Sequence, residues 1–593
     1  MRECARDKQQ ISGACHHWLV EGLTPRFAWQ IRQAVDLGPA VVAAGARHKL
    51  SERLVGLLAA RGHASPAALD AWAADARAGL RDPALLPDAA AFVARVGRAV
   101  DGRERCLVFG DFDADGLTGL AILAIALRRL GLDVATYVPD RTDEGHGLSS
   151  AAIERARVND RTLIVTADCG TSSGLEIELA RAAGIDVLVT DHHRPPPALP
   201  AAAAVVNPMR ADSTYPDRGL SGAGVALKCA QLLLGDEALE LADLAAIGTV
   251  ADVAPLVGEN RSIARLGLEL MRSRPRPGIA ALLSAARVDA ARISPESLAF
   301  GLVPRLNAGG RVGDAEVAAR LLLAQDAAEA ERLAAELEAA NGVRRELLAT
   351  ALAEARAAVD AQPDAPVTIV AGPWPAGIIG LVAGRLADER GRPAVVFCNS
   401  ADPWRGSARS GGFDIVAALA TMAELFDRYG GHSAAAGCHM PAANFVEFCR
   451  RLQEGAADLR PTQPSLLIDL VVEPHDVDYR LLRELAGLEP VGTANPQPLV
   501  GIRGMVVSRV RRANGGHSQL VLRKGAEVLD GICFGRDDLP DVLRDGDRLD
   551  IVARLDSRTF GGYESLQLEI RDVGPAGSLD QVAPPLSQPV RAA

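Results

Sequence analysis

The stretch CLVFGDFDADG, residues 106–116, decides the fold of the central part of this chain. An apolar run ends there in a loop that holds three aspartates within five residues. Two further apolar runs end in acidic residues in the same way, at TLIVTADCG (162–170) and IDVLVTDHH (185–193). Short apolar runs that stop at polar turns are typical of buried β-strands.

Segments suited to helices, such as 117–130 and 173–183, separate these runs. Alternation of strand and helix predicts a parallel sheet covered on both faces. In a doubly wound sheet, the carboxyl ends of neighbouring strands face one crevice. The acidic strand ends are therefore expected to converge on one point. The predicted strands are 106–110, 133–139, 162–168, 185–191 and 202–208.

The acidic loop at 111–115 needs an explanation beyond local structure. A helix cap or an Asx turn explains one aspartate but not three. An EF-hand fails because no acidic ligand stands at the twelfth loop position and the flanks are strand-like. Carboxylates with imidazoles and without thiolates suit Mn²⁺ or Mg²⁺. Enough oxygens are present for two ions, an arrangement that hydrolyses phosphoesters.

Length and composition limit the other possibilities. With 593 residues the chain has room for roughly four domains. Its net charge of −11 argues against a polybasic, histone-like protein. The longest clear apolar run, Leu120 to Leu127, has eight residues, too few for a membrane span. Nine cysteines without a CxxC pair indicate reduced thiols, and hence a cytoplasmic protein.

Four other regions have distinct patterns. Residues 1–95 are predicted to be helical, and 314–360 form one or two long helices. The glycine-rich stretch 404–437 is typical of binding loops rather than of packing. From 499 to 573, short strands alternate with turns, as in a small β-barrel such as an OB-fold.

Several motifs together resemble a known family. In order and spacing, the acidic motifs resemble those of the DHH phosphoesterase superfamily; they are GDFDADG (110–116), TADCG (166–170), TDHH (190–193) and GTVADVAPLVGENR (248–261). Five later motifs are similar to those of its RecJ branch, bacterial exonucleases specific for single-stranded DNA; they are PRLNAGGRVG (304–313), GIIGLVAGRL (377–386), RGSARS (405–410), GGHSAAAG (430–437) and LEPVGTANPQP (488–498).

The resemblance implies a multidomain α/β fold. It has a doubly wound parallel-sheet DHH domain, a long connecting helix, an α/β DHHA1 domain and a C-terminal OB-type β-barrel. The expected parts are a helical N-terminal region (1–95), the DHH domain (96–313), connecting helices (314–362), the DHHA1 domain (363–462), the OB-fold domain (463–575) and a disordered tail (576–593).

The resemblance also implies a site for two ions, Mn²⁺ or Mg²⁺. Asp113, helped by Asp111, would bind one ion, and Asp168 would bridge to the second. The implied metal ligands are Asp111, Asp113, Asp115, Asp168, His192 and Asp252.

Catalytic and substrate-binding roles follow from the same resemblance. His193 would face the scissile phosphate as a hydrogen-bond donor or general acid, and Asp191 would orient the histidines. The implied catalytic residues are therefore His193, Asp191 and the bridging Asp168. The implied substrate-binding residues are Arg305, Asn307, Arg311, Ser407, Arg409, Ser410 and His432. Two positions depart from the family pattern. Pro375 replaces a histidine, and His146, which can still stack on a base, replaces an aromatic residue.

The implied activity is a two-metal, 5′→3′ exonuclease that releases 5′-mononucleotides from single-stranded DNA in recombination and repair. Single-strand-binding protein and a RecQ-type helicase are implied partners of a monomer that does not bind membranes. Two alternatives stay open. One is a phosphoesterase for short oligonucleotides or pyrophosphate, although such relatives lack the barrel. The other is a scaffold like the eukaryotic replicative-helicase subunit, although such scaffolds have lost much of the metal set.

Overall fold

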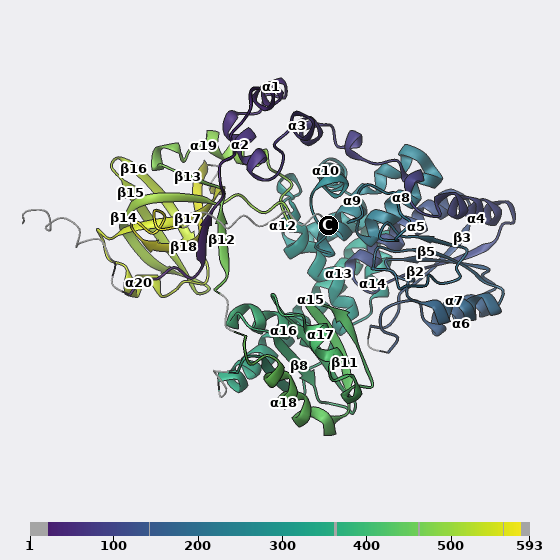
Figure 1. Cartoon of the computed structure of the whole chain (residues 1–593). Helices are drawn as coiled ribbons and strands as arrows, with labels where there is room; N and C mark the ends of the chain where they lie inside the picture. The colour runs from purple at the N-terminus through teal and green to yellow at the C-terminus, as the bar shows by residue number, and fades with distance from the viewer. Residues whose placement is uncertain are drawn as a thin grey trace, which may run out of the picture. The chain divides into compact units, whose positions relative to one another are not determined.

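The computed structural model of the chain describes residues 20, 22–141, 143–360, 365–459, 463–560 and 563–582 (Figure 1). Of the predicted tail, 583–593 lies outside the described residues. The chain forms two compact units. Among the described residues, one unit combines those up to Ala74 with Gln463–Val491 and those from Pro496 on, and the other comprises those from Asp75 to 459 together with Gly492–Asn495. In the described part of the chain, each helix is too short or too polar to cross a membrane.

The larger unit contains the predicted doubly wound sheet, and all five strands are parallel in the order β3-β2-β4-β5-β6. Apolar side chains alternate between its faces. Val108 packs toward one group of helices, while Leu107 and Phe109 pack toward the other. The strands are β2 (Arg105–Gly110), β3 (Asp133–Tyr137), β4 (Leu163–Ala167), β5 (Asp186–Thr190) and β6 (Ala204–Val206).

Helices cover both faces of this sheet, which confirms the predicted fold class (Figure 1). The first face packs against α5 (Ala114–Arg129), α8 (Gly222–Leu234) and α9 (Ala242–Ala251). The second packs against α6 (Ser150–Val158) and α7 (Gly174–Ala182). Further helices follow: α10 (Gly258–Ser273), α11 (Pro277–Ala286), α13 (Val303–Val312), α14 (Glu316–Leu323) and the 34-residue α15 (Ala327–Asp360).

A second sheet of five strands, in the order β10-β11-β9-β8-β7, follows α15. The glycine-rich stretch predicted to form loops supplies three of these strands, so that prediction is wrong. Its glycines lie in an antiparallel hairpin, where Gly430 pairs with Gly437. The strands are β7 (Thr368–Gly372), β8 (Ala394–Cys398), β9 (Trp404–Arg409), β10 (Arg428–His432) and β11 (Ala435–Met440). One face packs against α16 (Ala376–Arg390), and the other against α17 (Ile415–Ala420) and α18 (Phe445–Gly455).

The smaller unit holds the barrel. Its sheet runs β13-β14-β15-β16-β18-β17 and closes because β14 also pairs with β17. These strands are β13 (Leu470–Val472), β14 (Val500–Ala513), β15 (His517–Lys524), β16 (Glu527–Cys533), β17 (Arg548–Phe560) and β18 (Tyr563–Pro575). The helices of this unit include α1 (Pro39–Arg47), α2 (Glu52–Ala60), α3 (Pro66–Ala73) and α19 (Tyr479–Ala486).

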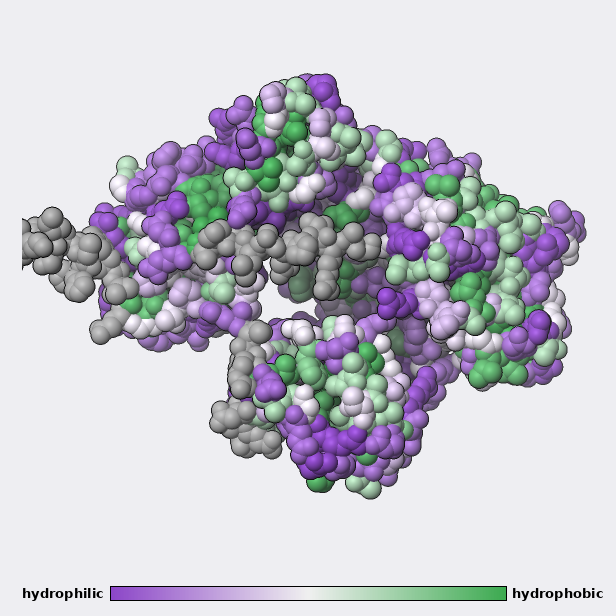
Figure 2. Space-filling model, in the orientation of Figure 1, coloured by the Kyte–Doolittle hydropathy of each residue, from purple (hydrophilic) through white to green (hydrophobic). Residues whose placement is uncertain are grey.

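The start of the described chain is not purely helical as predicted. Strand β1 (Ala28–Ile31) pairs in parallel with β12 (Ser465–Ile468), which is distant in sequence. The buried carboxylate of Asp572 fixes this segment, since it accepts hydrogen bonds from the backbone N–H of Arg26 (3.1 Å) and Phe27 (3.0 Å) and from Nε1 of Trp29 (2.8 Å). Across both units, Figure 2 shows hydrophilic residues interrupted by hydrophobic patches on the visible face.

Candidate metal centre

Strand register sets the first carboxylates level with one another. Gly110, the last residue of β2, pairs with Ala167 at the end of β4, and Ala167 pairs with Thr190 at the end of β5. Asp111, Asp168 and Asp191 are the next residues of the three strands, so their side chains leave the sheet at one edge. The predicted convergence of acidic strand ends therefore has a simple cause in the parallel pairing.

The first turn of α5 carries the other two aspartates of the acidic loop. Asp113 is the N-cap, and its side chain accepts hydrogen bonds from the backbone N–H of Asp115 (3.0 Å) and Gly116 (3.2 Å). The Asp115 carboxylate is buried and accepts from the backbone N–H of Gly222 (2.7 Å) and Ala223 (2.8 Å), at the start of α8. Two helix N-termini thus surround the acidic loop, and both favour negative charge.

Backbone conformation and close packing hold Asp168 in place. Its φ of +63° is in the left-handed region, which costs a non-glycine residue about 1–2 kcal/mol. Gly222 leaves the space that its side chain occupies, because a Cβ there would lie 2.5 Å from the Cβ of Asp168. Gly248 does the same for Asp115, since a Cβ there would lie 2.4 Å from its Oδ1.

Three overlapping groups of side chains have ligand atoms within 4.8 Å of one another. The shared members are Asp168 and His192, which join the groups into one centre. Two of the three groups contain the ligands that the family resemblance implies for the two ions. The groups are Asp111 with Asp113 and Asp168; Asp115 with His192 and Asp252; and Asp168 with His192 and His193.

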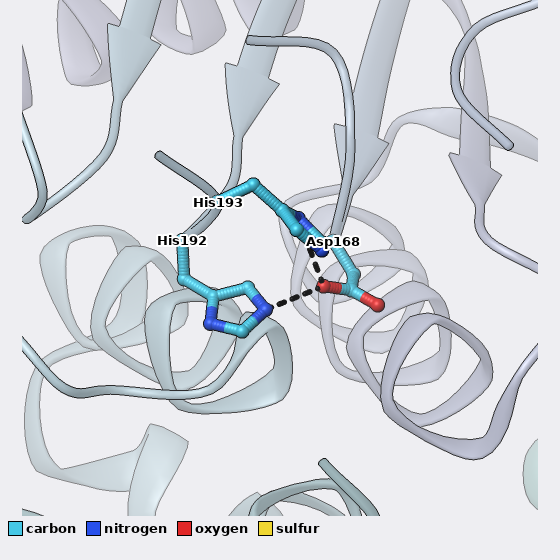
Figure 3. A group of neighbouring side chains, drawn as sticks. All are labelled: Asp168, His192 and His193. Atoms are coloured by element: carbon cyan, nitrogen blue, oxygen red, sulfur yellow. Dashed lines mark ion pairs between the residues drawn. The ribbon is translucent and has the colours of Figure 1, made fainter. Parts of the chain in front are cut away.

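Buried atoms without hydrogen-bond partners mark the middle of this centre. Oδ1 of Asp111, Oδ1 of Asp168 and Nε2 of His192 have no hydrogen-bond partner among the described residues. Nε2 of His192 lies 3.0 Å from Oδ1 of Asp168, and Nδ1 of His193 lies 3.8 Å from the same oxygen (Figure 3). Each such atom costs about 1–3 kcal/mol if it stays unsatisfied. Oxygen and imidazole donors directed at a common space fit divalent cations of the Mn²⁺ or Mg²⁺ type.

The pKa values of the buried carboxyl groups also fit a site for cations. Burial, followed by the negative charge of Asp115, raises the pKa of Asp168 well above its usual range. Burial and the charge of Asp252 raise the pKa of Asp115 to about 7, although His192 acts in the opposite direction. Burial also raises the pKa of Asp111 and that of Asp252. The metal-free cluster therefore holds protons near neutral pH that bound cations would displace.

Asp191 differs from its neighbours because its carboxylate is fully hydrogen-bonded. Its Oδ1 lies 2.8 Å from Nδ1 of His193 and accepts from the backbone N–H of His192 (2.7 Å), while its Oδ2 accepts from that of Thr171 (2.9 Å). Burial alone would raise the pKa of Asp191, but the hydrogen bond and charge of His193 hold it well below the usual range. A proton on Nδ1 of His193 leaves Nε2 free to face a ligand.

His146 belongs to the centre through a contact that the sequence does not predict. The family resemblance suggests only that its ring can stack on a base, and in the structure its Nδ1 lies 2.8 Å from Oδ2 of Asp111. Desolvation alone would lower the pKa of His146, but the hydrogen bond to Asp111 outweighs it and raises the pKa to about 9. The ring also packs edge-on against His193, with centroids 5.0 Å apart. His146 thus fixes one oxygen of Asp111 and leaves the other unpaired.

A cavity of about 810 Å³ opens beside the metal centre, and it is lined by segments that follow strands of the first sheet and by β9, β10 and β11 of the second sheet. Of the predicted site residues, Asp191, His193, Ser407, Arg409 and His432 line it. Its basic side chains make it suitable for an anionic ligand. Three of these basic side chains are not among the predicted site residues, namely Arg141, Arg194 and Arg428.

Four predicted substrate-binding residues instead contact the protein itself. Nη1 of Arg305 donates to the carbonyl of Gly301 (2.6 Å), and its Nε lies 2.5 Å from Glu338. The buried side chain of Ser410 accepts a hydrogen bond from the backbone N–H of Phe413 (3.0 Å). None of the four lines the 810 Å³ cavity.

Asn307 and Arg311, the other two of the four, contact the backbone of the acidic loop's helix and of α16. Oδ1 of Asn307 accepts from the backbone N–H of Ala114 (2.7 Å), in the first turn of α5. Nη1 of Arg311 donates to the carbonyl of Gly377 (3.0 Å). Burial, together with the charge of Arg141, lowers the pKa of Arg311 to about 9.

Arg141 and the position of the absent histidine complete the surroundings. Arg141 lies over the ring of Phe112, 4.6 Å from its centroid, so the acidic loop itself holds this arginine. No sequence signal distinguishes it from the other arginines of the chain. Pro375 is the N-cap of α16, and the preceding Trp374 donates from Nε1 to Glu354 (2.7 Å). The position of the absent histidine therefore serves to start a helix.

Comparisons with known proteins agree with this architecture. Three family models match: the DHH family N-terminal domain over residues 105–249, the DHHA1 domain over 364–458 and the RecJ OB domain over 468–572. The single-stranded-DNA-specific exonuclease RecJ of Bacillus subtilis is 35% identical over 489 residues, 81% of this chain and 62% of that protein. RecJ of Escherichia coli is 35% identical over 508 residues, 79% of this chain and 87% of that protein.

A solved structure covers almost the whole fold. The crystal structure of RecJ from Thermus thermophilus in complex with Mn²⁺ superimposes with a TM-score of 0.77 at 30% identity, over 92% of this chain and 79% of that one. RecJ from the same organism was also solved with Mg²⁺. The DHH, DHHA1 and barrel parts occur here in one chain with every expected acidic motif filled. The chain therefore belongs to the RecJ family of metal-dependent, single-stranded-DNA-specific exonucleases.

Proposed function

We propose that this chain hydrolyses single-stranded DNA from its 5′ end, releases 5′-mononucleotides and acts in DNA recombination and repair. The observation that carries the proposal is the set of buried atoms without a hydrogen-bond partner on Asp111, Asp168 and His192, where three parallel strand ends meet. Family membership supports the substrate class. The match of the barrel to the RecJ OB domain supports a long strand rather than a dinucleotide or pyrophosphate.

Residue roles in this proposal follow from the contacts. Asp113 and Asp111 would hold one divalent cation, with Asp168 between the two sites. Two such cations supply an activated water and neutralise charge at the leaving oxygen. The second cation would be held by Asp115, His192 and Asp252.

His193 is the residue that we propose to face the scissile phosphate. Its Nδ1 is held 2.8 Å from Asp191, and its ring lines the cavity, so Nε2 is directed toward a bound strand. It would donate a hydrogen bond to the phosphate or a proton to the departing 3′ oxygen. Asp191 acts through His193 as a positioning residue.

We propose that the 5′-phosphate binds at the wall of the cavity that the second sheet forms. Ser407, Arg409 and His432 lie there, and Nη1 of Arg409 already donates to Oγ of Ser407 (3.1 Å). An arginine held in this way presents its remaining donors to a phosphate. Arg311, close to Arg141 and Arg409, adds positive charge behind the cavity. A grip on the terminal phosphate makes cleavage directional.

The domain boundaries form part of the proposal. Structure and family models support a DHH domain near 96–313, connecting helices at 314–362, a DHHA1 domain at 363–462 and an OB-fold domain at 463–575. Among the described residues, α1, α2 and α3 belong to the compact unit that contains the barrel.

Setting and partners also belong to the proposal. Seven described cysteines carry free thiols, which supports a reducing, cytoplasmic environment. Single-strand-binding protein and a RecQ-type helicase are the partners that family membership suggests, and we propose that the enzyme acts as a monomer. Pull-down from defined mixtures and analytical ultracentrifugation test these three points.

Digestion of end-labelled DNA tests the activity. Single strands labelled at the 5′ or the 3′ end are incubated with the full chain and Mn²⁺ or Mg²⁺. We expect immediate release of the 5′ label as a mononucleotide and progressive shortening of the 3′-labelled strand. Asp168→Ala should abolish turnover while strand binding is largely retained. Release of the 3′ label first, or activity that survives Asp168→Ala, contradicts the proposal.

A further inference from the structure

One face of the second sheet continues beyond the residues proposed to bind the 5′-phosphate. Cross-strand partners share a face, so β10, β11 and β9 form three rows there. We number them outward: row 1 is His432, Ala435 and Arg409; row 2 is Gly430, Gly437 and Ser407; row 3 is Arg428, His439 and Arg405.

Row 1 is the end nearest the metal centre. Arg409 lies close enough to Arg311 for its charge to act on that residue, and Arg311 in turn responds to Asp113. Successive rows are two positions apart in the sequence, which corresponds to about 6.6 Å along each strand. Row 3 therefore lies about 13 Å beyond Arg409, on the side away from the acidic cluster.

Row 2 leaves the space between the cationic rows open. Two of its three members are glycines, and a Cβ added to Gly430 would meet no atom within 4 Å. Helix α16 covers the β8 side of this face, where a Cβ on Gly380 would lie 3.1 Å from Ser407 and from Arg409. The β10 side is exposed along its whole length. The cavity is thus open at the back of the proposed 5′-phosphate position.

Row 3 carries positive charge that the protein does not neutralise. Within the part of the chain that the structure describes, the side chains of Arg405 and Arg428 have neither an ion pair nor a hydrogen bond. Burial and the positive charges of Arg405 and Arg428 lower the pKa of His439, while Asp427 acts in the opposite direction. Arg428 also lines the cavity that contains His193. Guanidinium groups without protein partners at the end of an open trough are suited to phosphate.

We propose that row 3 binds the outer phosphates of a 5′-triphosphate, so that strands with triphosphorylated 5′ ends are substrates. This inference rests on the proposed function, because it takes Ser407 and Arg409 as the position of the first phosphate. Row 3 lies one row spacing, about 6.6 Å, beyond Ser407, and two further phosphates can bridge that distance. The glycines of row 2 leave the path between them clear.

The chemistry stays that of the proposed hydrolysis. Water attacks the phosphorus between the first and second nucleotides, and the bond to the 3′ oxygen of the first nucleotide breaks. That oxygen takes up a proton and becomes a hydroxyl. The products are a nucleoside 5′-triphosphate and a strand one nucleotide shorter with a 5′-monophosphate. Every later cycle then follows the monophosphate route.

Binding of matched strands tests the proposal on the full chain. Asp168→Asn is used to prevent cleavage, and one single-stranded sequence carries a 5′-triphosphate, a 5′-monophosphate or a 5′-hydroxyl. Fluorescence anisotropy should show that the triphosphate end binds about tenfold more tightly than the monophosphate end, as one added charge-assisted hydrogen bond implies. Adding Arg405→Ala or His439→Ala should bring the ratio of the two affinities close to one, and Arg405→Lys should keep most of it.

A matched control and a product assay separate the possible failures. Arg450→Ala removes an arginine from α18, on the opposite face of the sheet, and should leave the ratio unchanged. Equal affinities for the two ends, or a ratio that persists without Arg405, overturns the inference. With wild-type protein and Mn²⁺, the first product from the triphosphate strand should be the nucleoside triphosphate. Loss of activity on the monophosphate strand too refutes the proposed function, while the binding ratio still judges row 3.

Discussion

Replacing Gly222 with alanine is expected to disable the metal centre while the protein stays folded. A Cβ at this position would lie 2.5 Å from the Cβ of Asp168 and 2.6 Å from its Oδ1. Carbon atoms pack at about 3.5–4.0 Å, so the Asp168 side chain or α8 has to move by about 1 Å. A misplacement of that size costs about 100-fold in rate. The overpacking itself costs about 1–3 kcal/mol, less than the usual stability of a domain.

The matched control lies two residues further along the same helix. A Cβ on Gly224 meets its nearest atom, Oγ of Ser221, at 3.4 Å, which is ordinary contact. Gly224→Ala should therefore retain activity. The assay is the initial rate of release from 5′-labelled single-stranded DNA at saturating Mn²⁺, with urea unfolding of both variants in parallel. A Gly222→Ala rate within about threefold of wild type, or equal loss in both variants, refutes the reasoning about Asp168.

Three further predictions follow from individual contacts. Asp572→Ala leaves three N–H donors without their acceptor and should lower the free energy of unfolding of the barrel unit by about 3 kcal/mol. Urea titration measures this loss, and an unchanged unfolding midpoint contradicts the role given to Asp572 in holding residues 26–29. Because the pKa of Asp115 is raised to about 7 from 3.8, the metal-free protein should become more stable as the pH falls from 7 toward 4, while its affinity for Mn²⁺ should fall over the same range. Calorimetry in buffers of different ionisation enthalpy should detect the release of protons when Mn²⁺ binds, and the absence of proton release contradicts the raised pKa. His146→Phe removes the hydrogen bond to Asp111 and should weaken Mn²⁺ binding about 10- to 100-fold, a loss that titration calorimetry measures and that base stacking alone does not produce.

The sequence predicts the metal centre well because its parts lie at the ends of parallel strands. Asp111 and Asp168 directly follow apolar runs, and parallel pairing without offset makes them neighbours. The same rule does not reveal Asp115, whose position depends on the first turn of α5 and on the backbone of Gly222. Asp115 is predicted only because it is part of a motif that resembles one of the family.

Side-chain direction is what the sequence could not supply. Arg305 and Ser410 belong to motifs with phosphate-binding chemistry, yet their polar atoms bond to Gly301 and Phe413. Arg141 and Arg428, in contrast, follow no motif and line the cavity. An arginine contacts solvent, a carbonyl or a ligand according to a few torsion angles, and a linear pattern does not encode them.

Glycine is also misleading in the second sheet. The run from 404 to 437 has the pattern of loops because glycine weakens strands. Here Gly430 and Gly437 are partners in a hairpin, where their missing side chains leave the floor of a trough open. The pairing of β1 with β12 is equally invisible in the sequence, because it joins segments more than four hundred residues apart.

Counting bound ions is the most direct test of the central claim that one cluster of side chains holds two divalent cations. Mn²⁺ is titrated into the metal-free full chain, and free ion is followed by electron paramagnetic resonance. We predict two ions per chain for the wild type, with coupled spins because Asp168 is shared, and weaker, uncoupled binding for Asp168→Asn. A single ion in the wild type, or two coupled ions that persist after Asp168 and His192 are both replaced, contradicts the account.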